Sequence, residues 1–191
     1  MQQEFSKHDS SGGESLPPAE VPHAKTEILP AMETLEHSVE ISPTFSDDLA
    51  ICVIKPDAFG HRDAIVKRLE ESGLYVVSRN TKELTENFVI GGMYDPAGMS
   101  KPVADATARH FASGPSEIIL VKGDHVVKKL LETVGVKTNP ALCDPDTIRY
   151  IYGTHVPEEL EEGLKYYRNA AHRPRDSAEA QKNLKDFGEI L

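Results

Sequence analysis

The clearest hydrophobic pattern in the chain is a continuous apolar run from Leu49 to Ile54, which Lys55 ends. An apolar run of this length without a polar break predicts a strand that is buried on both faces at the centre of a sheet. Beyond it, residues 63–72 place their apolar side chains three and four positions apart, which predicts a helix that ends at Gly73. The same two patterns predict strands at 74–78 and 117–121 and helices at 103–111 and 126–133, the last capped by Asp124.

The carboxyl-terminal third contains shorter elements between polar connections. Its composition predicts a helix over residues 157–166 and a short strand end at 168–172, and Asp176 to Glu179 resembles a capping box that begins the last helix. Strand, helix, strand, strand, helix and strand in this order describe a ferredoxin-like βαββαβ sandwich. This is an α+β fold with a four-stranded antiparallel sheet.

Residues 1–46 lack this periodicity. Five prolines interrupt a stretch rich in Ser, Glu and His, and such a composition cannot bury a core. The stretch also carries −6 of the net charge of −10. We therefore predict two parts, a disordered acidic leader at 1–46 and a folded domain at 47–191.

The charge and the apolar runs exclude some classes of partner. A net charge of −10 argues against nucleic acid or an anionic membrane surface as the main partner, so a bound anion must be held by a local pocket. No apolar run approaches the roughly 20 residues that cross a bilayer, and the amino terminus lacks the layout of a secretory signal. We expect a cytoplasmic protein. Cys52 and Cys143 lack CxxC spacing, which predicts neither a disulfide nor a structural zinc site.

Four short polar motifs stand out in the folded part. They are Lys55-Pro56-Asp57, Thr138-Asn139-Pro140, Thr147-Ile148-Arg149 and Asn169-Ala170-Ala171-His172. Each alone has an ordinary explanation, because strand-end lysines are usually solvated and loop Thr and Asn residues usually cap turns. In their order and approximate spacing, the four together resemble the nucleoside diphosphate kinase family over residues 49–191. Ser113-Gly114-Pro115, directly before an apolar strand, matches a fifth element of that family.

The resemblance implies a reaction and a set of site residues. It implies a ping-pong phosphoryl transfer, in which a histidine takes the γ-phosphate of ATP and passes it to a nucleoside diphosphate, and His172 matches that histidine. Lys55 and Arg149 match the family's phosphate-contacting cations, Thr138 its hydroxyl donor, and Asn169 its contact to the nucleotide sugar. Mg²⁺ would be held mainly through the nucleotide phosphates, with no dedicated metal cage. A homo-oligomer is also implied.

The loop after His172 departs from the family. The family has a Gly-Ser-Asp-Ser loop there, whereas this chain has Arg-Pro-Arg-Asp-Ser at 173–177 and is two residues shorter. In the family, a glutamate on the next helix orients the histidine. Counting across the shorter loop places Gln181 at that position, with Glu179 nearby.

A second phosphate-binding arginine of the family has no match, because Leu, Glu and Thr occupy residues 131–133. We hypothesise that Arg173 or Arg175 replaces it. Each lies within a few residues of His172, and a guanidinium group can bind two phosphate oxygens in a fork.

The nucleoside end differs as well. Val103 lies nearest the register of the family's stacking aromatic residue, while Tyr166 falls where a small aliphatic residue is usual. The aromatic and aliphatic sides of the base site would then be exchanged, which retains stacking. Either Phe88 or Tyr94 could replace the family's active-site tyrosine. A glutamate-rich insertion within 150–167 predicts a surface helix beside the site, for a partner or an oligomer contact.

Three functions are compatible with the sequence. The first is an active nucleoside diphosphate kinase. The second is a catalytically impaired nucleotide-binding or regulatory module, which the altered loop and the missing arginine favour. The third is a ferredoxin-like interaction protein whose working part is the acidic leader, in which case the resemblance is superficial. ATP binding separates the third from the others, and transfer of a labelled γ-phosphate to GDP separates the first from the second.

Overall fold

The computed structural model describes residues 48–188 and 190–191, so the leader predicted at 1–46 lies outside the described residues. The η elements are short 3-10 helices. In chain order the elements are β1 (Leu49–Ile54), η1 (Pro56–His61), α1 (Arg62–Glu71), β2 (Tyr75–Lys82), α2 (Glu86–Val89), η2 (Pro96–Gly98), α3 (Lys101–Phe111), β3 (Ser116–Lys122), α4 (Val126–Val134), η3 (Pro140–Leu142), α5 (Ile148–Tyr152), β4 (Glu158–Glu159), η4 (Glu161–Gly163), β5 (Lys165–Tyr166), β6 (Ala171–His172) and α6 (Ser177–Phe187).

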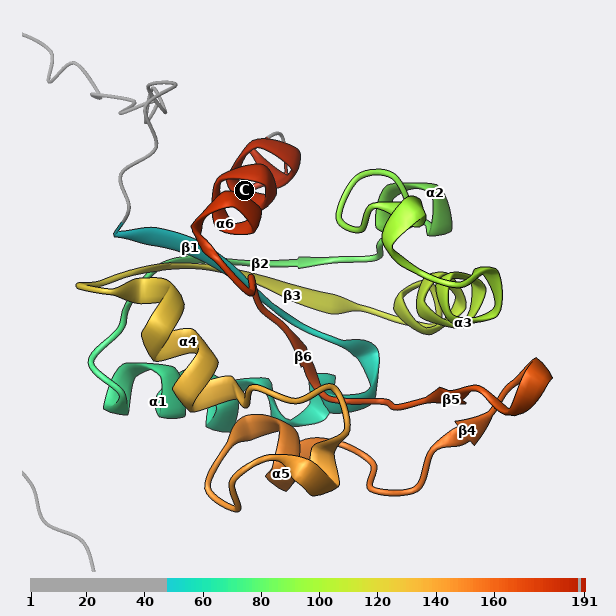
Figure 1. Cartoon of the computed structure of the whole chain (residues 1–191). Helices are drawn as coiled ribbons and strands as arrows, with labels where there is room; N and C mark the ends of the chain where they lie inside the picture. The colour runs from blue at the N-terminus through green and yellow to red at the C-terminus, as the bar shows by residue number, and fades with distance from the viewer. Residues whose placement is uncertain (1–47, 189) are drawn as a thin grey trace, which may run out of the picture. The chain divides into compact units, whose positions relative to one another are not determined.

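Four of the strands form one sheet in the order β2-β3-β1-β6. Every neighbouring pair in it is antiparallel, and β6 lies at an edge, where Val53 is opposite His172. Figure 1 shows α1 and α4 on one face of this sheet and α6 on the other. The arrangement confirms the predicted α+β, ferredoxin-like architecture.

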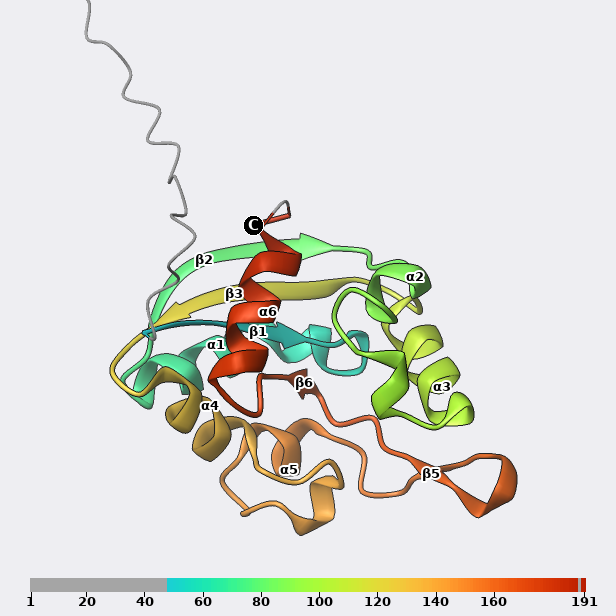
Figure 2. The same ribbon diagram turned by 45° about the horizontal axis from the view of Figure 1, so that its top comes forward.

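Strand β1 is apolar throughout because both of its faces are covered. Ala50, Cys52 and Ile54 belong to the core that α1 and α4 complete. Ile51 and Val53 point the other way, into a second core that includes Leu184 and Phe187 of α6. Successive strand residues face opposite sides of a sheet, so a helical layer on each side requires apolar residues at consecutive positions. The two layers are also visible after rotation in Figure 2.

The prediction of a helix over residues 157–166 is wrong. Strands β4 and β5 instead pair as a small antiparallel hairpin, with Glu158 opposite Tyr166. The turn between them places Glu162 at φ 60° and Gly163 at φ 71°, and this left-handed backbone reverses the chain where a helix would have continued. The insertion therefore contributes a hairpin rather than a surface helix.

The predicted helix ends are partly confirmed. Asp176 is the N-cap of α6, because its carboxylate accepts a hydrogen bond from the amide of Glu179. Asp124 does not cap α4, since the N-cap is His125, held at φ 53°, and it makes no side-chain cap bond. Among the residues that the structure describes, no helix combines the length and the apolar character needed to cross a membrane.

Candidate active site

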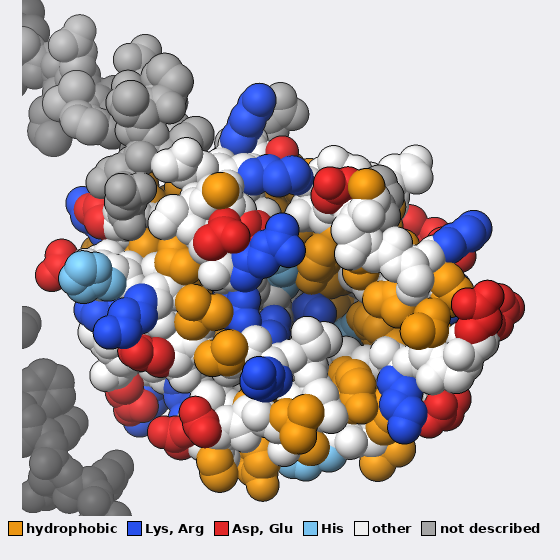
Figure 3. Space-filling model, viewed as in Figure 1, with side chains coloured by type: hydrophobic (Ala, Val, Ile, Leu, Met, Phe, Trp, Pro, Cys, Tyr) orange, Lys and Arg blue, Asp and Glu red, His pale blue; other side chains and the backbone are white. Residues whose placement is uncertain are grey.

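A pocket of about 720 Å³ contains all five residues predicted to form the site. Lys55 follows β1, Thr138 precedes η3, Arg149 lies on α5, and Asn169 and His172 lie at or next to β6. Figure 3 shows the surface hollowed here, with basic side chains gathered around the opening. Segments that are far apart in the sequence therefore meet in one cavity.

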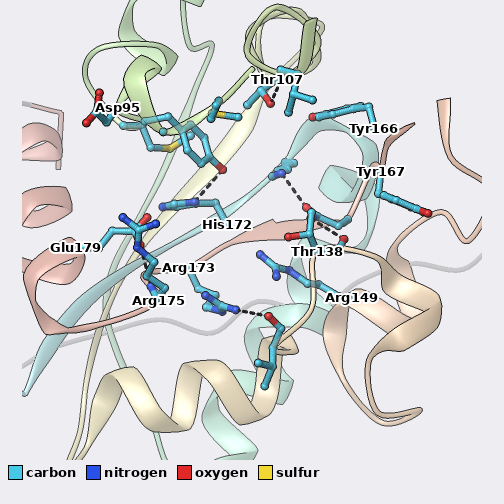
Figure 4. Close-up of a pocket in the computed structure, with 18 of the residues that line it drawn as sticks. Asp95, Thr107, Thr138, Arg149, Tyr166, Tyr167, His172, Arg173, Arg175 and Glu179 are labelled. Carbon is cyan, nitrogen blue, oxygen red and sulfur yellow. Dashed lines mark hydrogen bonds and ion pairs between the residues drawn. The ribbon is translucent and has the colours of Figure 1, made fainter. Parts of the chain in front are cut away.

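His172 is fixed by hydrogen bonds on both ring nitrogens. Its Nε2 lies 3.0 Å from the amide oxygen of Asn183, and its Nδ1 lies 2.9 Å from the hydroxyl of Tyr94. An amide oxygen can only accept a hydrogen bond, so this contact assigns the ring proton to Nε2 and leaves the lone pair on Nδ1. In Figure 4 a dashed line that ends at the ring of His172 marks the contact with the hydroxyl. Nδ1 is thus the potential nucleophile.

The surroundings of His172 keep the imidazole neutral. Burial lowers its pKa to about 3, against a raising effect of the bond to Asn183, and the cations Lys55, Arg149 and Arg173 lower it further. The ring itself is 3 % exposed. A neutral imidazole keeps its lone pair available over the whole physiological pH range.

Lys55 and Asn169 are joined directly. The ammonium group of Lys55 donates to the side-chain oxygen of Asn169 over 2.8 Å, and the Asn169 amide donates to the backbone carbonyl of Thr138 over 3.1 Å. Burial lowers the pKa of Lys55 to about 7, Arg149 lowers it too, and Asp57 opposes them. The side chain of Thr138 is exposed to the pocket. These polar groups are placed so that an anionic ligand can contact them together.

Arg149 is a buried cation held by backbone carbonyls. Its guanidinium group donates to the carbonyls of Ala171, Gly135 and Lys137 over 3.0 to 3.3 Å. The carbonyl of Ala171 belongs to the strand residue before His172, so Arg149 and the imidazole are fixed relative to one another. Burial lowers the pKa of Arg149 below its usual value, which marks it as a cation with little solvent around it.

The two arginines after His172 differ sharply. Arg173 is 7 % exposed, and its guanidinium group donates to the carbonyls of Gly135 and Val136 over 3.2 and 2.9 Å. Burial lowers the pKa of Arg173 to about 10, and Arg149 lowers it further. The side chain of Arg175 is 79 % exposed, with Glu179 within 3.2 Å. Both line the pocket, but only Arg173 is a buried cation.

A backbone turn next to His172 is held by the Lys55-Pro56-Asp57 motif. Ala170 has φ 63°, and the amide of Ala171 bonds to the carbonyl of Asn169 over 2.6 Å across it. Asp57 accepts a hydrogen bond from the amide of Ala170 over 3.0 Å, and the amide of Lys55 donates to the Ala170 carbonyl over 2.8 Å. The motif after β1 thus stabilises the turn that delivers β6 to the pocket.

Tyr166 stands at the other end of the pocket and is held by a buried pair. Its hydroxyl lies 2.8 Å from Nδ1 of His110, whose Nε2 is 3.1 Å from the carboxylate of Asp57. Burial tends to raise the pKa of Asp57, but His110 and Lys55 together hold it below its usual value. Val103 and Tyr166, the residues expected at the base site, line the same pocket. No motif or spacing indicated a role for His110, which is one histidine among eight.

The structure corrects one predicted positioning residue and decides between two candidates for another. Gln181 was expected to orient His172, but it is exposed on α6, and Asn183 makes the contact. Of the two aromatic candidates, Tyr94 bonds to His172, whereas Phe88 packs edge-on against Phe187 with ring centroids 5.2 Å apart. Among the described residues no group of three or more His, Cys, Asp or Glu side chains is arranged to hold a metal ion.

The arrangement is that of an anion-binding site with a nucleophile. A neutral imidazole, whose Nδ1 lone pair accepts a hydrogen bond from the Tyr94 hydroxyl, lies in one pocket with the buried cations Lys55, Arg149 and Arg173. Such a site can bind phosphate groups and attack one of them.

Comparison with known proteins identifies the family of the chain. The family model for nucleoside diphosphate kinase matches residues 48–187. The chain therefore belongs to the nucleoside diphosphate kinase family, and the interpretation of the resemblance as superficial is wrong. A relative from Syntrophotalea carbinolica, named nucleoside diphosphate kinase, is 31 % identical over 123 residues, which cover 63 % of this chain and 88 % of the relative.

Solved structures share the fold. An NDP kinase from Pyrobaculum aerophilum aligns with a TM-score of 0.62 at 19 % identity, covering 73 % of this chain and 94 % of the other. A nucleoside-diphosphate kinase from Borrelia burgdorferi, solved with vanadate and ADP bound, aligns with a TM-score of 0.63 at 20 % identity over 73 % of this chain and 85 % of that one. At these identities the likeness establishes the fold.

Proposed function

We propose that the protein is an active nucleoside diphosphate kinase that transfers the γ-phosphate of ATP to nucleoside diphosphates through phosphorylated His172. One observation carries the proposal: the Nδ1 lone pair of a neutral imidazole shares a pocket with the buried cations Lys55 and Arg149. Neither cation has a carboxylate within ion-pair distance among the described residues. Buried charges without counter-ions favour binding of an anion such as a phosphate chain.

The chemistry consists of two symmetrical displacements. Nδ1 of His172 attacks the γ-phosphorus of ATP, a nitrogen–phosphorus bond forms, and the bond from that phosphorus to the bridging oxygen breaks, so that ADP leaves with the electron pair. After ADP is exchanged for another diphosphate, its terminal oxygen attacks the same phosphorus. The nitrogen–phosphorus bond then breaks and returns the lone pair to Nδ1. Throughout, Nε2 keeps its proton and donates it in a hydrogen bond to the side-chain oxygen of Asn183.

Each remaining residue has a binding role in this proposal. Lys55 and Arg149 neutralise the transferring group, which is the main contribution that a protein makes to phosphoryl transfer. Thr138 donates to the phosphates, and Asn169 contacts the sugar. Because Lys55 and Asn169 are already hydrogen-bonded to each other at 2.8 Å, one nucleotide could engage both without a large movement. The Borrelia protein of the same fold binds ADP and vanadate, which supports a nucleotide as the ligand.

Mg²⁺ would enter this site with the nucleotide. The described residues offer no cluster of carboxylates arranged as a metal cage, although three acidic residues, Asp95, Asp176 and Glu179, line the pocket. Such a lining fits an ion that is bound chiefly by phosphate oxygens. When bound, the ion would supply additional positive charge at the phosphates.

The proposal is tested by steady-state kinetics. GTP formation from ATP and GDP is measured with both substrates varied, for the wild type and for His172→Gln. We expect parallel double-reciprocal lines for the wild type, as a ping-pong mechanism requires, and no transfer above background for the variant. Intersecting lines, or a variant as active as the wild type, would refute the covalent route.

A catalytically impaired nucleotide-binding module is the alternative, and one observation favours it. Asn183 orients His172 with a neutral amide, which contributes no negative charge to balance an imidazolium-like phosphohistidine. In that case the wild type would bind ATP and ADP but form no GTP in the same assay.

We also propose a cytoplasmic homo-oligomer. The edge strand β2 supports the second part, because it carries the exposed apolar side chains Tyr75 and Val77. Light scattering of the purified full chain tests it, and a monomer at micromolar concentration would contradict it.

A further inference from the structure

Arg173 is a buried cation in the pocket that has no role in the reaction proposed above. It is 7 % exposed, lines the pocket, and directly follows His172. No carboxylate lies within ion-pair distance of Arg173 or of Arg149 in the part of the chain that the structure describes. Removing a guanidinium group from water without a counter-ion is unfavourable, so two such groups in one pocket indicate that an anion completes the site.

The fold brings these two guanidinium groups together at the edge of the sheet. Strand alternation sends His172 toward Asn183 of α6 and sends Arg173 to the opposite face, toward the residues that follow α4. Both side chains still line one pocket, because β6 is an edge strand. Arg149 reaches the same place from α5, and the two guanidinium groups share one acceptor, the carbonyl of Gly135, at 3.3 and 3.2 Å.

Arg173 also has unused hydrogen-bonding capacity. Its Nη atoms donate to the carbonyls of Gly135, Val136 and Pro174, but its buried Nε has no partner. A buried N–H group without an acceptor is unfavourable until a ligand supplies one. The backbone that carries it is also restricted, because a residue before proline is confined to extended conformations. Figure 4 shows the side chains of Arg149 and Arg173 adjacent to each other on the same side of His172.

We propose that Arg173 is a second phosphate-binding guanidinium group, which acts with Arg149 on the phosphate chain of the nucleotide while His172 attacks its terminal phosphorus. The inference rests on the proposed function for the identity of the ligand. Two guanidinium groups can bind a phosphate group through several charge-assisted hydrogen bonds, which a single lysine cannot do. Arg173 would thus be a catalytic residue in addition to the five that the motifs indicate.

A purely structural role is the competing explanation. Arg173 could serve only to hold the carbonyls of residues 135 and 136 at the end of α4. That role predicts a loss of stability, and it predicts equal weakening of every nucleotide. A phosphate contact instead predicts weakening that grows with the number of phosphates.

The experiment measures ATP, ADP and AMP binding by calorimetry with Mg²⁺, in a His172→Gln background so that ATP is not consumed. Arg173→Met removes the charge and keeps the length of the side chain. Arg175→Met is the matched control, because Arg175 is exposed and already paired with Glu179. We expect Arg173→Met to weaken ATP by about tenfold to a hundredfold and AMP by less than about threefold, while Arg175→Met changes neither by more than about twofold.

Arg173→Lys keeps the inference testable if the methionine variant does not fold. It retains the charge but not the planar fork, so its ATP affinity should fall between those of the parent and the methionine variant. ATP binding equal to the parent in either variant, or an equal loss for ATP and AMP, would overturn the assignment. A different result separates the two proposals. If the loss of binding grows with the number of phosphates but the wild type transfers no phosphate, the proposed function is contradicted and Arg173 is still a phosphate ligand.

Discussion

At His172 the physical effects on the imidazole act almost entirely in one direction. Burial and the charges of Lys55, Arg149 and Arg173 all disfavour the protonated ring, and only the bond to Asn183 opposes them. The ordinary pKa of histidine is about 6.5, and at that pH half of the side chains would carry a second ring proton and lack a nitrogen lone pair. The pocket thus keeps the Nδ1 lone pair of His172 unprotonated, but it also makes this nitrogen less basic.

This predicts the protonation state of His172 directly. The pKa lowered to about 3 means that the ring stays neutral as the pH falls from 7 to 5, and that it takes up a proton only well below that range. Nitrogen-15 NMR of the histidine rings should show His172 as the Nε2–H tautomer throughout, with His172→Gln identifying the signal. A His172 ring that titrates between pH 6 and 7 would have the ordinary histidine pKa of about 6.5, and this result would contradict the account of the pocket.

Asn183 provides a second prediction at this scale. Asn183→Leu leaves the buried Nε2–H without an acceptor and frees the ring to rotate, so we expect kcat/KM to fall by about tenfold to a hundredfold, as for other residues that orient a reactive histidine. Asn183→Asp should keep the ring in place and raise the pKa of His172, which a shift of the NMR midpoint would report. Gln181→Leu is the control, because Gln181 is exposed on the same helix. An equal loss from Gln181→Leu would restore the role first expected for that residue.

At the scale of elements, α5 and η3 pack closely against each other at Gly153, the C-cap of α5. A Cβ atom built there would clash with the carbonyl oxygen of Arg149 and would lie 2.7 Å from Cγ of Pro140. No side chain therefore fits without a shift of the helix that carries Arg149 or of the Thr-Asn-Pro turn that carries Thr138. The two motifs that we propose bind phosphate depend on this close approach.

Gly153→Ala should therefore destabilise the fold and weaken nucleotide binding together. We expect a loss of about 1–3 kcal/mol in the free energy of unfolding, from overpacking, measured by denaturant titration. ADP affinity should fall in the same variant because Arg149 moves. Gly60→Ala is the matched control, since a Cβ there meets nothing within 4 Å. Equal stability of the two variants would show that α5 adapts freely.

Elements with a strong periodic pattern were predictable, and those fixed by tertiary contacts were not. Strand β1 is found at the predicted residues, because an apolar run between two helical layers has few other solutions. The β4-β5 hairpin was missed, because its glutamates suit a helix by composition, and the left-handed backbone of Glu162 and Gly163 between the two strands leaves little trace in a pattern. Helix α6 was predicted, but not which of its faces meets His172.

The error over Asn183 shows why side-chain roles are harder to predict than elements. Positions 181 and 183 differ by about 200° around an α-helix, so a count that is two residues off selects the opposite face. Gln181 points to solvent and Asn183 into the core. The count across the shorter loop gave Gln181, and the contact lies two residues further along α6. Tyr94 could be predicted only as one of two candidates and His110 not at all, because only tertiary packing brings these two residues to the pocket.

At the scale of the whole molecule, charge is separated rather than balanced locally. The chain has a net charge of −10, yet its pocket gathers Lys55, Arg149 and Arg173. These cations come from three segments of the sequence, after β1, on α5 and after β6. An acidic protein can thus bind an anion strongly at one place while its remaining surface repels polyanions. This agrees with the sequence-based expectation that a bound anion needs a local pocket.

The domain boundary at 46 to 47 stays a prediction, since residues 1–46 lie outside the described part of the chain. The family match begins at residue 48, where β1 is about to start. The described residues that line the pocket, from Lys55 to Lys182, all lie within the matched range.

The central claim is that Nδ1 of His172 carries the phosphate between nucleotides. The most direct measurement is incubation of the full chain with γ-labelled ATP, isolation of the protein, and a chase with GDP. We predict a label that is labile in acid, absent from His172→Ala, and transferred to GDP during the chase. A wild type that binds ATP but takes up no such label, or a His172→Ala variant that is labelled equally, would contradict the account.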